Sequence, residues 1–509
     1  MFISVPDAPP AAPTAAVPLW PYQSRYCRMA QALAKELFGA LDEELHPVVQ
    51  LLAVPADPNL PARCLEPEEC ALPADRFAGA VARGQDLQYA SLWAYTDRDD
   101  LTPAILGRRQ LGRGLRGAIQ EVLNELDADT PHLHFAGWPV LINESYVVTV
   151  VRLQRKALGA HPTLQPNRYY TDGRPVPSSL VLAALYRFNE EGVKSLTEPE
   201  PGAGVMTRPR EVEELLRGAG RAFLDAPAQA LGLDPAVAQL FATCNTISSL
   251  RYEGAESVGC LLLARRHHPN LEEVFALTCP TPLTDYRAVR KLLEMTTSDV
   301  HLLADGANVY ALGRQVGTYD TAREDLFAVN FITHYAWELQ HGPNLLLRAH
   351  YGLPGLPRNR LSRASFRRDL KRTFGLTDAP KVERLWDVVL EASHQKHGTL
   401  LVITTEALAE ADRLKLQCTL VEPVPLTPFI TRLVTAIDGA VLLDPEGYCY
   451  SIGVILDGTA SGRGDGSRGA RYNSAMRYVE SSRYPCLAVV VSEDGLVNVL
   501  TSKRDGGER

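Results

Sequence analysis

The first part of the chain has a helical and a strand-like hydrophobic pattern. Apolar side chains recur every four residues, at Met29, Leu33, Leu37 and Leu41. This spacing places them along one face of an amphipathic helix. Residues 146–153 are rich in Val and Thr, a composition typical of a strand. We therefore predict an α+β domain over residues 18–196, and its sequence indicates no particular chemistry.

A break follows at residues 197–204, where two prolines and two glycines disfavour regular structure. Beyond it we predict a second α+β domain over residues 208–375. Its predicted elements are a helix from about Arg208, strands over residues 259–264 and 274–277, and a helix over residues 287–295. Thr284 or Asp285 precedes the second helix and is suited to cap its free amide groups. Asp305-Gly306 is typical of a hairpin turn.

The second domain is predicted to end in a basic segment over residues 358–372. Phe366, Leu370 and Phe374 recur at helical spacing within and just beyond it, so we expect an amphipathic helix docked on a core. The favoured interpretation of its arginines is a solvated helix face. Binding of an anionic ligand or nucleic acid at this helix is the less favoured alternative.

The third part of the chain alternates helical patterns with short, continuously apolar runs. Helices are predicted over residues 380–390, 429–435 and 474–480, and strands over residues 399–403, 440–443 and 487–492. Continuous apolar strands interleaved with helices indicate an α/β fold in which helices cover both faces of a mixed central sheet. Active residues are then expected on loops at one sheet edge.

Composition is that of an ordinary globular protein of several domains, with 509 residues, 46% hydrophobic residues and a net charge of −8. The negative charge argues against a protein-wide electrostatic grip on nucleic acid. Residues 1–17, rich in Pro and Ala, are predicted to be a disordered tail rather than a signal peptide. No apolar run is long enough for a membrane helix. Nine cysteines without a CxxC pair predict free thiols and a cytoplasmic location.

The most informative chemistry lies near the C-terminus. Asp438-Gly439-Ala440 precedes a predicted strand, and Arg471-Tyr472-Asn473 follows a loop rich in glycine and arginine over residues 458–469. A carboxylate that faces bare backbone amides and guanidinium groups is suited to hold nucleotide phosphates beside a metal ion. An Asp-Gly pair alone is more often a turn. Asp305-Gly306-Ala307 has no such loop downstream and is therefore interpreted as a turn.

Four fragments of this region, in this order, resemble the diadenylate cyclase domain, which also occurs in the DNA-integrity scanning protein. The fragments are His397 to Ile403, Asp438 to Ala440, Gly469 to Ala475 and Val491 to Gly495. The resemblance covers residues 380–509, about a quarter of the chain. Residues 249–254 and 290–293 are more loosely similar to presumed sensor modules that accompany such domains.

The resemblance implies an α/β nucleotide-binding domain that condenses two ATP molecules to cyclic di-AMP and releases pyrophosphate. It also implies two such domains face to face, and Mg²⁺ or Mn²⁺ held by Asp438. Asp438, Gly439, Ala440 and Arg471 are the candidate catalytic residues. The candidate nucleotide-binding residues are Gly462, Arg463, Gly466, Ser467, Arg468, Gly469, Tyr472, Asn473, Ser474, Ser492 and Glu493.

One departure from the family pattern leaves two functions open. The family's second motif is usually Arg-His-Arg, whereas this chain has Arg471-Tyr472-Asn473. Arg463 and Arg468 are candidates to restore the missing charge. The first hypothesis is a cyclic-dinucleotide synthase controlled by N-terminal sensor domains. The second is a catalytically degenerate cyclase-like domain that senses a nucleotide without converting it.

Overall fold

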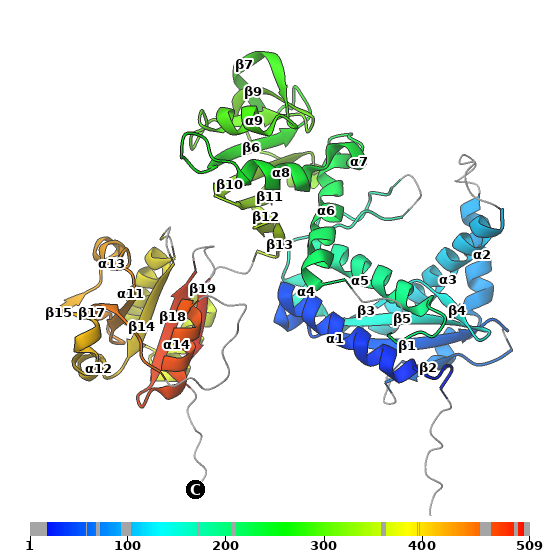
Figure 1. Cartoon of the computed structure of the whole chain (residues 1–509), viewed down its shortest axis with the longest axis horizontal. Helices are drawn as coiled ribbons and strands as arrows, with labels where there is room; N and C mark the ends of the chain where they lie inside the picture. Colours follow the sequence, from blue (N-terminus) through cyan, green and yellow to red (C-terminus); the bar gives the residue numbers. More distant parts are fainter. Residues whose placement is uncertain are drawn as a thin grey trace, which may run out of the picture. The chain divides into compact units, whose positions relative to one another are not determined.

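The computed structural model describes residues 18–57, 59–67, 72–92, 103–170, 174–204, 210–357, 363–393, 395, 398–458, 470–492 and 497–502. The chain forms two compact units, divided between Pro357 and Arg358. Each unit contains its own mixed arrangement of sheets and flanking helices (Figure 1). None of the helices in the described ranges is both long enough and apolar enough to cross a bilayer.

The N-terminal part of the first unit is built on an antiparallel sheet. Its strands are β1 (Val48–Pro55), β2 (Arg63–Glu66), β3 (His132–Ala136), β4 (Val140–Ile142) and β5 (Ser145–Gln154). The order is β2-β1-β5-β3, and β4 also pairs with β5. The helices are α1 (Gln23–Leu41), α2 (Ala80–Leu92), α3 (Pro103–Asp127), α4 (Arg155–Gly159) and α5 (Leu180–Leu196).

The side chains of β5 point alternately to the two faces of this sheet, and both sets are apolar, so helices cover both faces. Val147 and Val151 belong to the core formed with α1 and α5, whereas Val148 and Val150 belong to a separate core formed with α3. Successive strand side chains point to opposite faces, so residues of one parity are buried under each helical layer. The predicted amphipathic helix is α1, in which Leu37 and Leu41 are buried.

The second part of this unit contains an eight-stranded sheet, in the order β13-β12-β11-β10-β6-β8-β9-β7. The strands are β6 (Gly259–Ala264), β7 (Leu271–Pro282), β8 (His301–Ala304), β9 (Asn308–Gln315), β10 (Leu326–Thr333), β11 (Ala336–His341), β12 (Asn344–His350) and β13 (Leu353–Gly355). The helices are α6 (Val212–Ala230), α7 (Pro235–Ala238), α8 (Leu240–Ser249) and α9 (Tyr286–Leu293). Among the described strand pairs of this sheet, β6 and β8 are parallel and the other pairs are antiparallel.

Several local predictions in this region are confirmed. Asp285 caps α9 by accepting a hydrogen bond from the Ala288 amide at 3.2 Å. Asp305 lies in the turn between β8 and β9 and accepts hydrogen bonds from the amides of Ala307 and Asn308 at 3.1 and 2.8 Å. The strands after residue 320 were not predicted. Buried and more exposed residues alternate along them over short stretches, so the sequence has no long hydrophobic run there.

The break at residues 197–204 separates two helices that share one core. Leu185 and Phe188 of α5 and Leu216 and Phe223 of α6 belong to the same buried cluster, which continues into the eight-stranded sheet. The prolines and glycines therefore mark a connection between packed helices within the first unit.

The C-terminal unit is a sheet of six strands in the order β15-β17-β16-β14-β18-β19. The strands are β14 (Thr399–Thr404), β15 (Thr419–Pro425), β16 (Ala440–Leu443), β17 (Tyr448–Val454), β18 (Cys486–Val491) and β19 (Val497–Thr501). The helices are α10 (Arg363–Phe374), α11 (Ala379–Ala392), α12 (Ala407–Arg413), α13 (Pro428–Val434) and α14 (Ala470–Ser481). β14 and β16 are parallel, and the other pairs are antiparallel.

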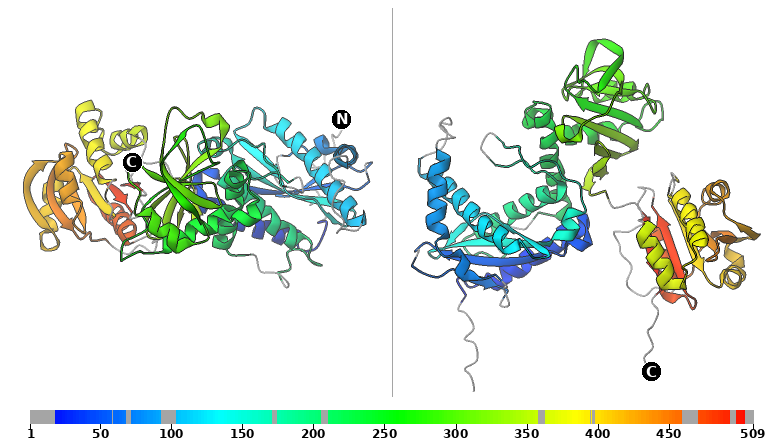
Figure 2. Two further views of the ribbon diagram at one scale, coloured as in Figure 1. Left: turned by 90° about the horizontal axis from the view of Figure 1, so that it is seen from above. Right: turned by 180° about the vertical axis from the view of Figure 1, so that it is seen from behind.

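Helices cover both faces of this sheet, as the sequence predicted (Figures 1 and 2). Leu401 and Ile403 of β14 pack into a core with α10 and α11. Leu400 and Val402 pack on the opposite face with residues of α12 and α14. The α/β fold follows from the central strands, whose side chains are apolar on both faces.

The basic helix belongs to this C-terminal unit. Phe366 and Leu370 of α10 are fully buried in its core, whereas the sequence pattern had placed the helix at the end of the preceding domain. Arg363 forms an ion pair with Glu383, and Arg372 donates to Asp369 and Thr501 at 3.2 and 2.9 Å. These surface partners support the interpretation of a solvated helix face.

The cysteines differ from the prediction at one position. Cys64, on the edge strand β2, is disulfide-bonded. The other described cysteines, seven in number, are free. The expectation of free thiols is therefore wrong for Cys64, which is half-buried on this edge strand.

Candidate active site

Asp438 and Arg471 meet at one edge of the C-terminal sheet. Asp438 directly precedes β16 by way of Gly439, and its carboxylate is 89% exposed. Arg471 is the second residue of α14, and its Nη2 donates to Asp438 Oδ1 at 3.0 Å. The two motifs that the sequence singled out are therefore brought into direct contact, although they are separated by two strands and a long loop.

Strand register explains why other candidates gather at the same edge. Ala440 lies beside Leu400 of β14 and opposite Val454 of β17. Thr399 of β14 lies opposite Val491 of β18. The starts of β14 and β16 and the ends of β17 and β18 therefore share one edge, which places Ser492 on the same side of the sheet as Asp438.

Gly439 fixes the approach of Asp438 to the sheet. Its φ of +106° lies in the region that favours glycine. A Cβ at this position would lie 2.5 Å from the carbonyl carbon of Gly453 on β17. Because backbone occupies that space, a side chain at position 439 would push the Asp438 turn away from β17. Ala440 is fully buried in the core beneath it.

The first turn of α14 supplies polar groups next to the carboxylate. Arg471, Tyr472, Asn473 and Ser474 are all half-buried, and Tyr472 packs against the core. The amide groups of a first helical turn have no partner within the helix, and the helix dipole there favours anions. This end of α14 is therefore suited to a phosphate group.

Arg477 is a further candidate on α14 that the sequence analysis did not name. Its Nε donates to the carbonyl oxygen of Asn473 at 3.1 Å, so its guanidinium lies back along the first turn of α14. Helical side chains tilt toward the N-terminus, which is why a residue one turn later reaches this position. The i+4 spacing from Asn473 was the available signal.

An ion-pair network holds the backbone that follows β17. Arg413 of α12 donates to both carboxylate oxygens of Asp457 at 2.6 and 3.0 Å and also pairs with Glu410. Glu410 in turn accepts from Tyr478 Oη of α14 at 2.8 Å. The hydrogen bonds that Arg413 donates to Glu410 and Asp457 raise the pKa of Arg413, and the Arg413 guanidinium lowers the pKa of Asp457. The network therefore ties α12 and α14 to the segment that enters the glycine-rich loop.

Other predicted residues cannot be placed. Gly462, Arg463, Gly466, Ser467, Arg468, Gly469 and Glu493 lie outside the described residues. No group of three or more His, Cys, Asp or Glu side chains suited to a metal ion occurs within the described residues. Among the described residues, Asp438 therefore belongs to no preformed carboxylate cluster of this kind.

Comparison with known families gives three matches along the chain. Residues 387–504 match the DAC family model, described as the DisA bacterial checkpoint controller nucleotide-binding domain. The C-terminal domain belongs to the DAC family. Residues 19–224 match the probable sensor domain DACNG, and residues 238–343 match the probable sensor domain DACNH. The DAC match contains Asp438, Arg471 and Ser492.

Two solved structures are similar to the chain. A crystal structure of a double mutant of DacA from Staphylococcus aureus has 16% sequence identity and a TM-score of 0.21, covering 25% of this chain and 91% of its own. A hypothetical membrane spanning protein from Bacillus cereus has 21% identity and a TM-score of 0.21, covering 28% of this chain and 71% of its own. The comparison with curated proteins found no match.

Proposed function

We propose that the C-terminal domain is a diadenylate cyclase. It condenses two ATP molecules to cyclic di-AMP and releases two pyrophosphates, under the control of the two N-terminal sensor domains. In each half of the reaction the 3′-hydroxyl oxygen of one ATP bonds to the α-phosphorus of the other, and the bond to pyrophosphate breaks. The observation that carries the proposal is the contact between Asp438 and Arg471 at the sheet edge of a DAC-family domain.

The donor set fits Mg²⁺ or Mn²⁺ bound together with substrate. Mg²⁺ is usually held by one or two carboxylates and by the phosphates of its substrate, and Asp438 is an exposed carboxylate beside a helix N-terminus. A bound metal ion would lower the pKa of the attacking hydroxyl and neutralise charge that develops on phosphate. Asp438 would hold the metal ion, and Arg471, whose guanidinium contacts Asp438, lies where it could bind the phosphates.

Positive charge near α14 offsets the departure from the family motif. Asn473 brings no charge where the family usually has a second arginine. Arg477 lies against the backbone of Asn473 and supplies a guanidinium from within the same helix. Arg471 and Arg477 together give α14 two arginines, the number in the usual motif, which favours the enzyme over the degenerate sensor.

Exposed apolar side chains on α13 and at Ile437, which directly precedes Asp438, support self-association. Ile437 is 48% exposed, and Phe429 and Leu433, which share one face of α13, are 69% and 55% exposed. Large exposed apolar side chains mark interaction surfaces. A second copy of the domain seated here would bring its own nucleotide to face the first.

The test is incubation of the purified full chain with ATP and Mn²⁺, followed by chromatographic separation of the products. A cyclase gives cyclic di-AMP and pyrophosphate in a ratio of one to two. ATP that binds saturably but is recovered unchanged would instead establish the degenerate nucleotide sensor.

A further inference from the structure

One buried arginine links the two segments that resemble sensor modules. Arg290 of α9 is 1% exposed, and its Nη2 donates to the carbonyl oxygens of Ala255 and Glu256 at 3.0 and 2.6 Å. Its Nη1 forms an ion pair with Glu294, one helical turn later, at 2.7 Å. A guanidinium has several donors in a fixed plane, so its bonds to two successive carbonyls fix the course of that backbone. Arg290 therefore holds the surface loop over residues 250–256.

This loop lies against the turn between β10 and β11. Glu256 of the loop accepts a hydrogen bond from Thr333 Oγ1 at 2.5 Å. That bond lowers the pKa of Glu256, and smaller contributions in the same direction come from the His334 amide and from the charge of Arg251. The loop and the turn therefore form one surface, and Arg251 is exposed on it.

Four aromatic rings follow one another across this surface and the next turn. β11 begins at Ala336, opposite His350 at the end of β12, so the turns at these strand ends are neighbours. The Tyr351 amide donates to the Tyr335 carbonyl oxygen at 2.9 Å, and the two rings stack with their centroids 4.9 Å apart. The His334 ring lies 4.2 Å from that of Tyr335, and the His350 ring 4.5 Å from that of Tyr351. We call these four rings the aromatic strip.

The tyrosines of the aromatic strip are exposed and have an uncommon backbone conformation. Tyr351 is 65% exposed, and Tyr335 is 36% exposed. Their φ angles are +49° and +60°, in the left-handed region that suits glycine or asparagine. A bulky side chain in this region costs free energy, so its presence at two neighbouring turns points to a function for the rings.

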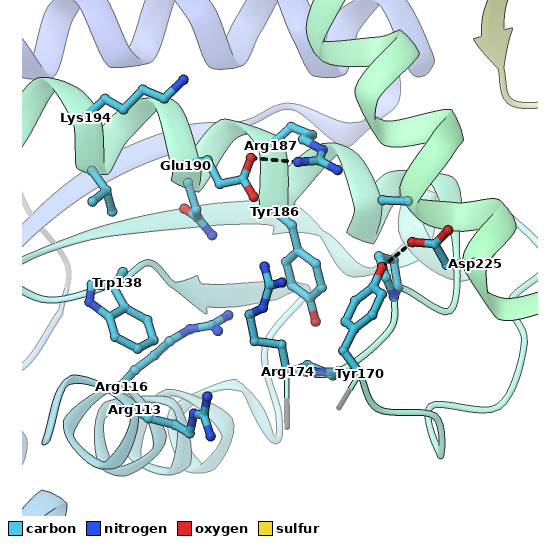
Figure 3. Close-up of a pocket in the computed structure, with 15 residues that line it drawn as sticks. Arg113, Arg116, Trp138, Tyr170, Arg174, Tyr186, Arg187, Glu190, Lys194 and Asp225 are labelled. Atoms are coloured by element: carbon cyan, nitrogen blue, oxygen red, sulfur yellow. Dashed lines mark hydrogen bonds and ion pairs between the residues drawn. The ribbon is translucent and has the colours of Figure 1, made fainter. Parts of the chain in front are cut away.

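Other aromatic side chains of this unit are enclosed. Trp138, Tyr170 and Tyr186 line a pocket of about 690 Å³, in which all three are half-buried (Figure 3). Tyr170 Oη donates to Asp225 there at 2.6 Å. Concave pockets of this size can enclose small molecules. The aromatic strip instead lies on exposed turns, which suits contact with the surface of a macromolecule.

Charges of both signs accompany the aromatic strip. Arg251, Glu253 and Glu256 are all exposed on the loop that Arg290 holds. A surface that combines apolar rings with both charge signs can be complementary to itself across a two-fold axis, because each cation can meet a carboxylate of the partner. Tyr and Arg are also enriched among the side chains that contribute most of the binding energy of interfaces. This composition favours a second copy of the chain over a partner of one charge sign.

We propose that the aromatic strip and the loop over residues 250–256 form a dimerisation surface of the sensor region, occupied by the same surface of a second copy of the chain. The exposed face of Tyr351 packs on the rings of the partner, and Arg251 pairs with the partner's Glu253. The loop and the turns are then the polar and apolar parts of one symmetric interface.

This inference rests on the proposed function in one respect, because a product made from two nucleotides requires two DAC domains. Tyr351 lies shortly before the division between the two units at Pro357. Association of the sensor regions would therefore tether two DAC domains and raise the effective concentration of each for the other.

The test is sedimentation of the full chain without nucleotide, at protein concentrations between about 0.1 and 100 μM. The wild type is expected to dimerise reversibly. Tyr351→Ala should weaken the dimer about ten- to hundredfold, because it removes a central ring from both copies. Tyr169→Ala is the matched control, since Tyr169 is 60% exposed in the same unit but is not part of this surface. It should dimerise as the wild type does.

Charge reversal tests the interface without removing a ring. Arg251→Glu places like charges opposite each other and should weaken the dimer at least about tenfold. Arg251→Glu combined with Glu253→Arg restores opposite charges with their signs exchanged, so it should regain most of the lost affinity. Circular dichroism checks that each variant is folded.

Cyclic di-AMP synthesis separates this proposal from the proposed function. Tyr351→Ala leaves the DAC domain unaltered, so it should reach the wild-type rate once its concentration is high enough for pairing. A wild type that dimerises through this surface but makes no cyclic di-AMP would contradict the cyclase and support the interface. The proposal is overturned if the wild type is monomeric, which would leave the surface to another kind of partner. It is also overturned if Tyr351→Ala and Arg251→Glu both dimerise as the wild type does.

Discussion

At the residue scale, identical tripeptides perform different tasks according to their surroundings. Asp305-Gly306-Ala307 and Asp438-Gly439-Ala440 have the same sequence. Asp305 uses its carboxylate on the amides of its own turn, whereas Asp438 meets Arg471 from a distant helix. The glycine- and arginine-rich loop downstream of Asp438 was the sequence feature that distinguished them.

Gly439→Ala should destabilise the C-terminal domain. The new methyl group would lie 2.5 Å from the carbonyl carbon of Gly453, and alanine is disfavoured at a φ of +106°. A backbone position of this kind costs about 1–3 kcal/mol. Thermal unfolding followed by circular dichroism measures the change. Gly375→Ala is the control, because Gly375 also has positive φ, at +69°, but no atom lies within 4 Å of its would-be Cβ. Equal stability of Gly439→Ala and the wild type would show that the turn is not constrained.

Arg471→Ala and Arg477→Ala should each weaken ATP binding about ten- to hundredfold. Each removes a charge-assisted contact, worth about 1.5–3 kcal/mol, at the N-terminal end of α14. Calorimetric titration with a non-hydrolysable ATP analogue measures the affinity. Arg483→Ala, an exposed arginine beyond the end of α14, serves as the control. Wild-type affinity in both α14 variants would move the nucleotide away from this helix.

At the element scale, the central strands and their covering helices could be predicted, while the edge strands could not. β14, β16 and β18 are apolar on both faces and were predicted from that pattern. β15 and β19 lie at the sheet edges, and their residues are exposed or half-buried. Such strands do not require a continuous run of apolar residues, so the sequence contained no hydrophobic pattern that would reveal them. At the site, the sequence named Asp438 and Arg471 but could not give their contact, which depends on packing between elements.

The network of Glu410 should stabilise the C-terminal domain. Glu410 of α12 is buried, pairs with Arg413 of the same helix and accepts a hydrogen bond from Tyr478 of α14. Glu410→Ala leaves the Tyr478 hydroxyl, which lies in the core, without its acceptor, and such a loss costs about 1–3 kcal/mol. Tyr478→Phe removes the same hydrogen bond without leaving a polar group and should cost less. Urea unfolding compares the two, and a larger loss in Tyr478→Phe would contradict this role for Glu410.

At the scale of the whole molecule, the chain joins two probable sensor domains to a DAC domain. The two sensor matches lie in the first compact unit and the DAC match in the second. The sensor matches and the DAC match therefore lie in separately packed units. Length and composition could predict several domains, but the core shared across residues 197–204 depends on long-range packing that local sequence does not encode.

Cyclase activity should depend on protein concentration. Each DAC domain has one candidate site at Asp438, so a product made from two nucleotides requires two domains to meet. Below the dissociation constant of the pair, the rate should fall with about the square of protein concentration. Activity measured alongside sedimentation at the same concentrations tests this expectation. A monomeric protein with constant specific activity would contradict the face-to-face arrangement.

The most direct measurement compares the products formed by wild type, Asp438→Asn and Asp305→Asn from ATP and Mn²⁺. Asp438→Asn removes the charge that binds metal but little volume, so cyclic di-AMP should fall at least about a hundredfold while the thermal melt is unchanged. Asp305→Asn alters the same tripeptide in the hairpin turn and should retain synthesis. Undiminished cyclic di-AMP from Asp438→Asn, or an equal loss in both variants, would contradict a catalytic centre at Asp438.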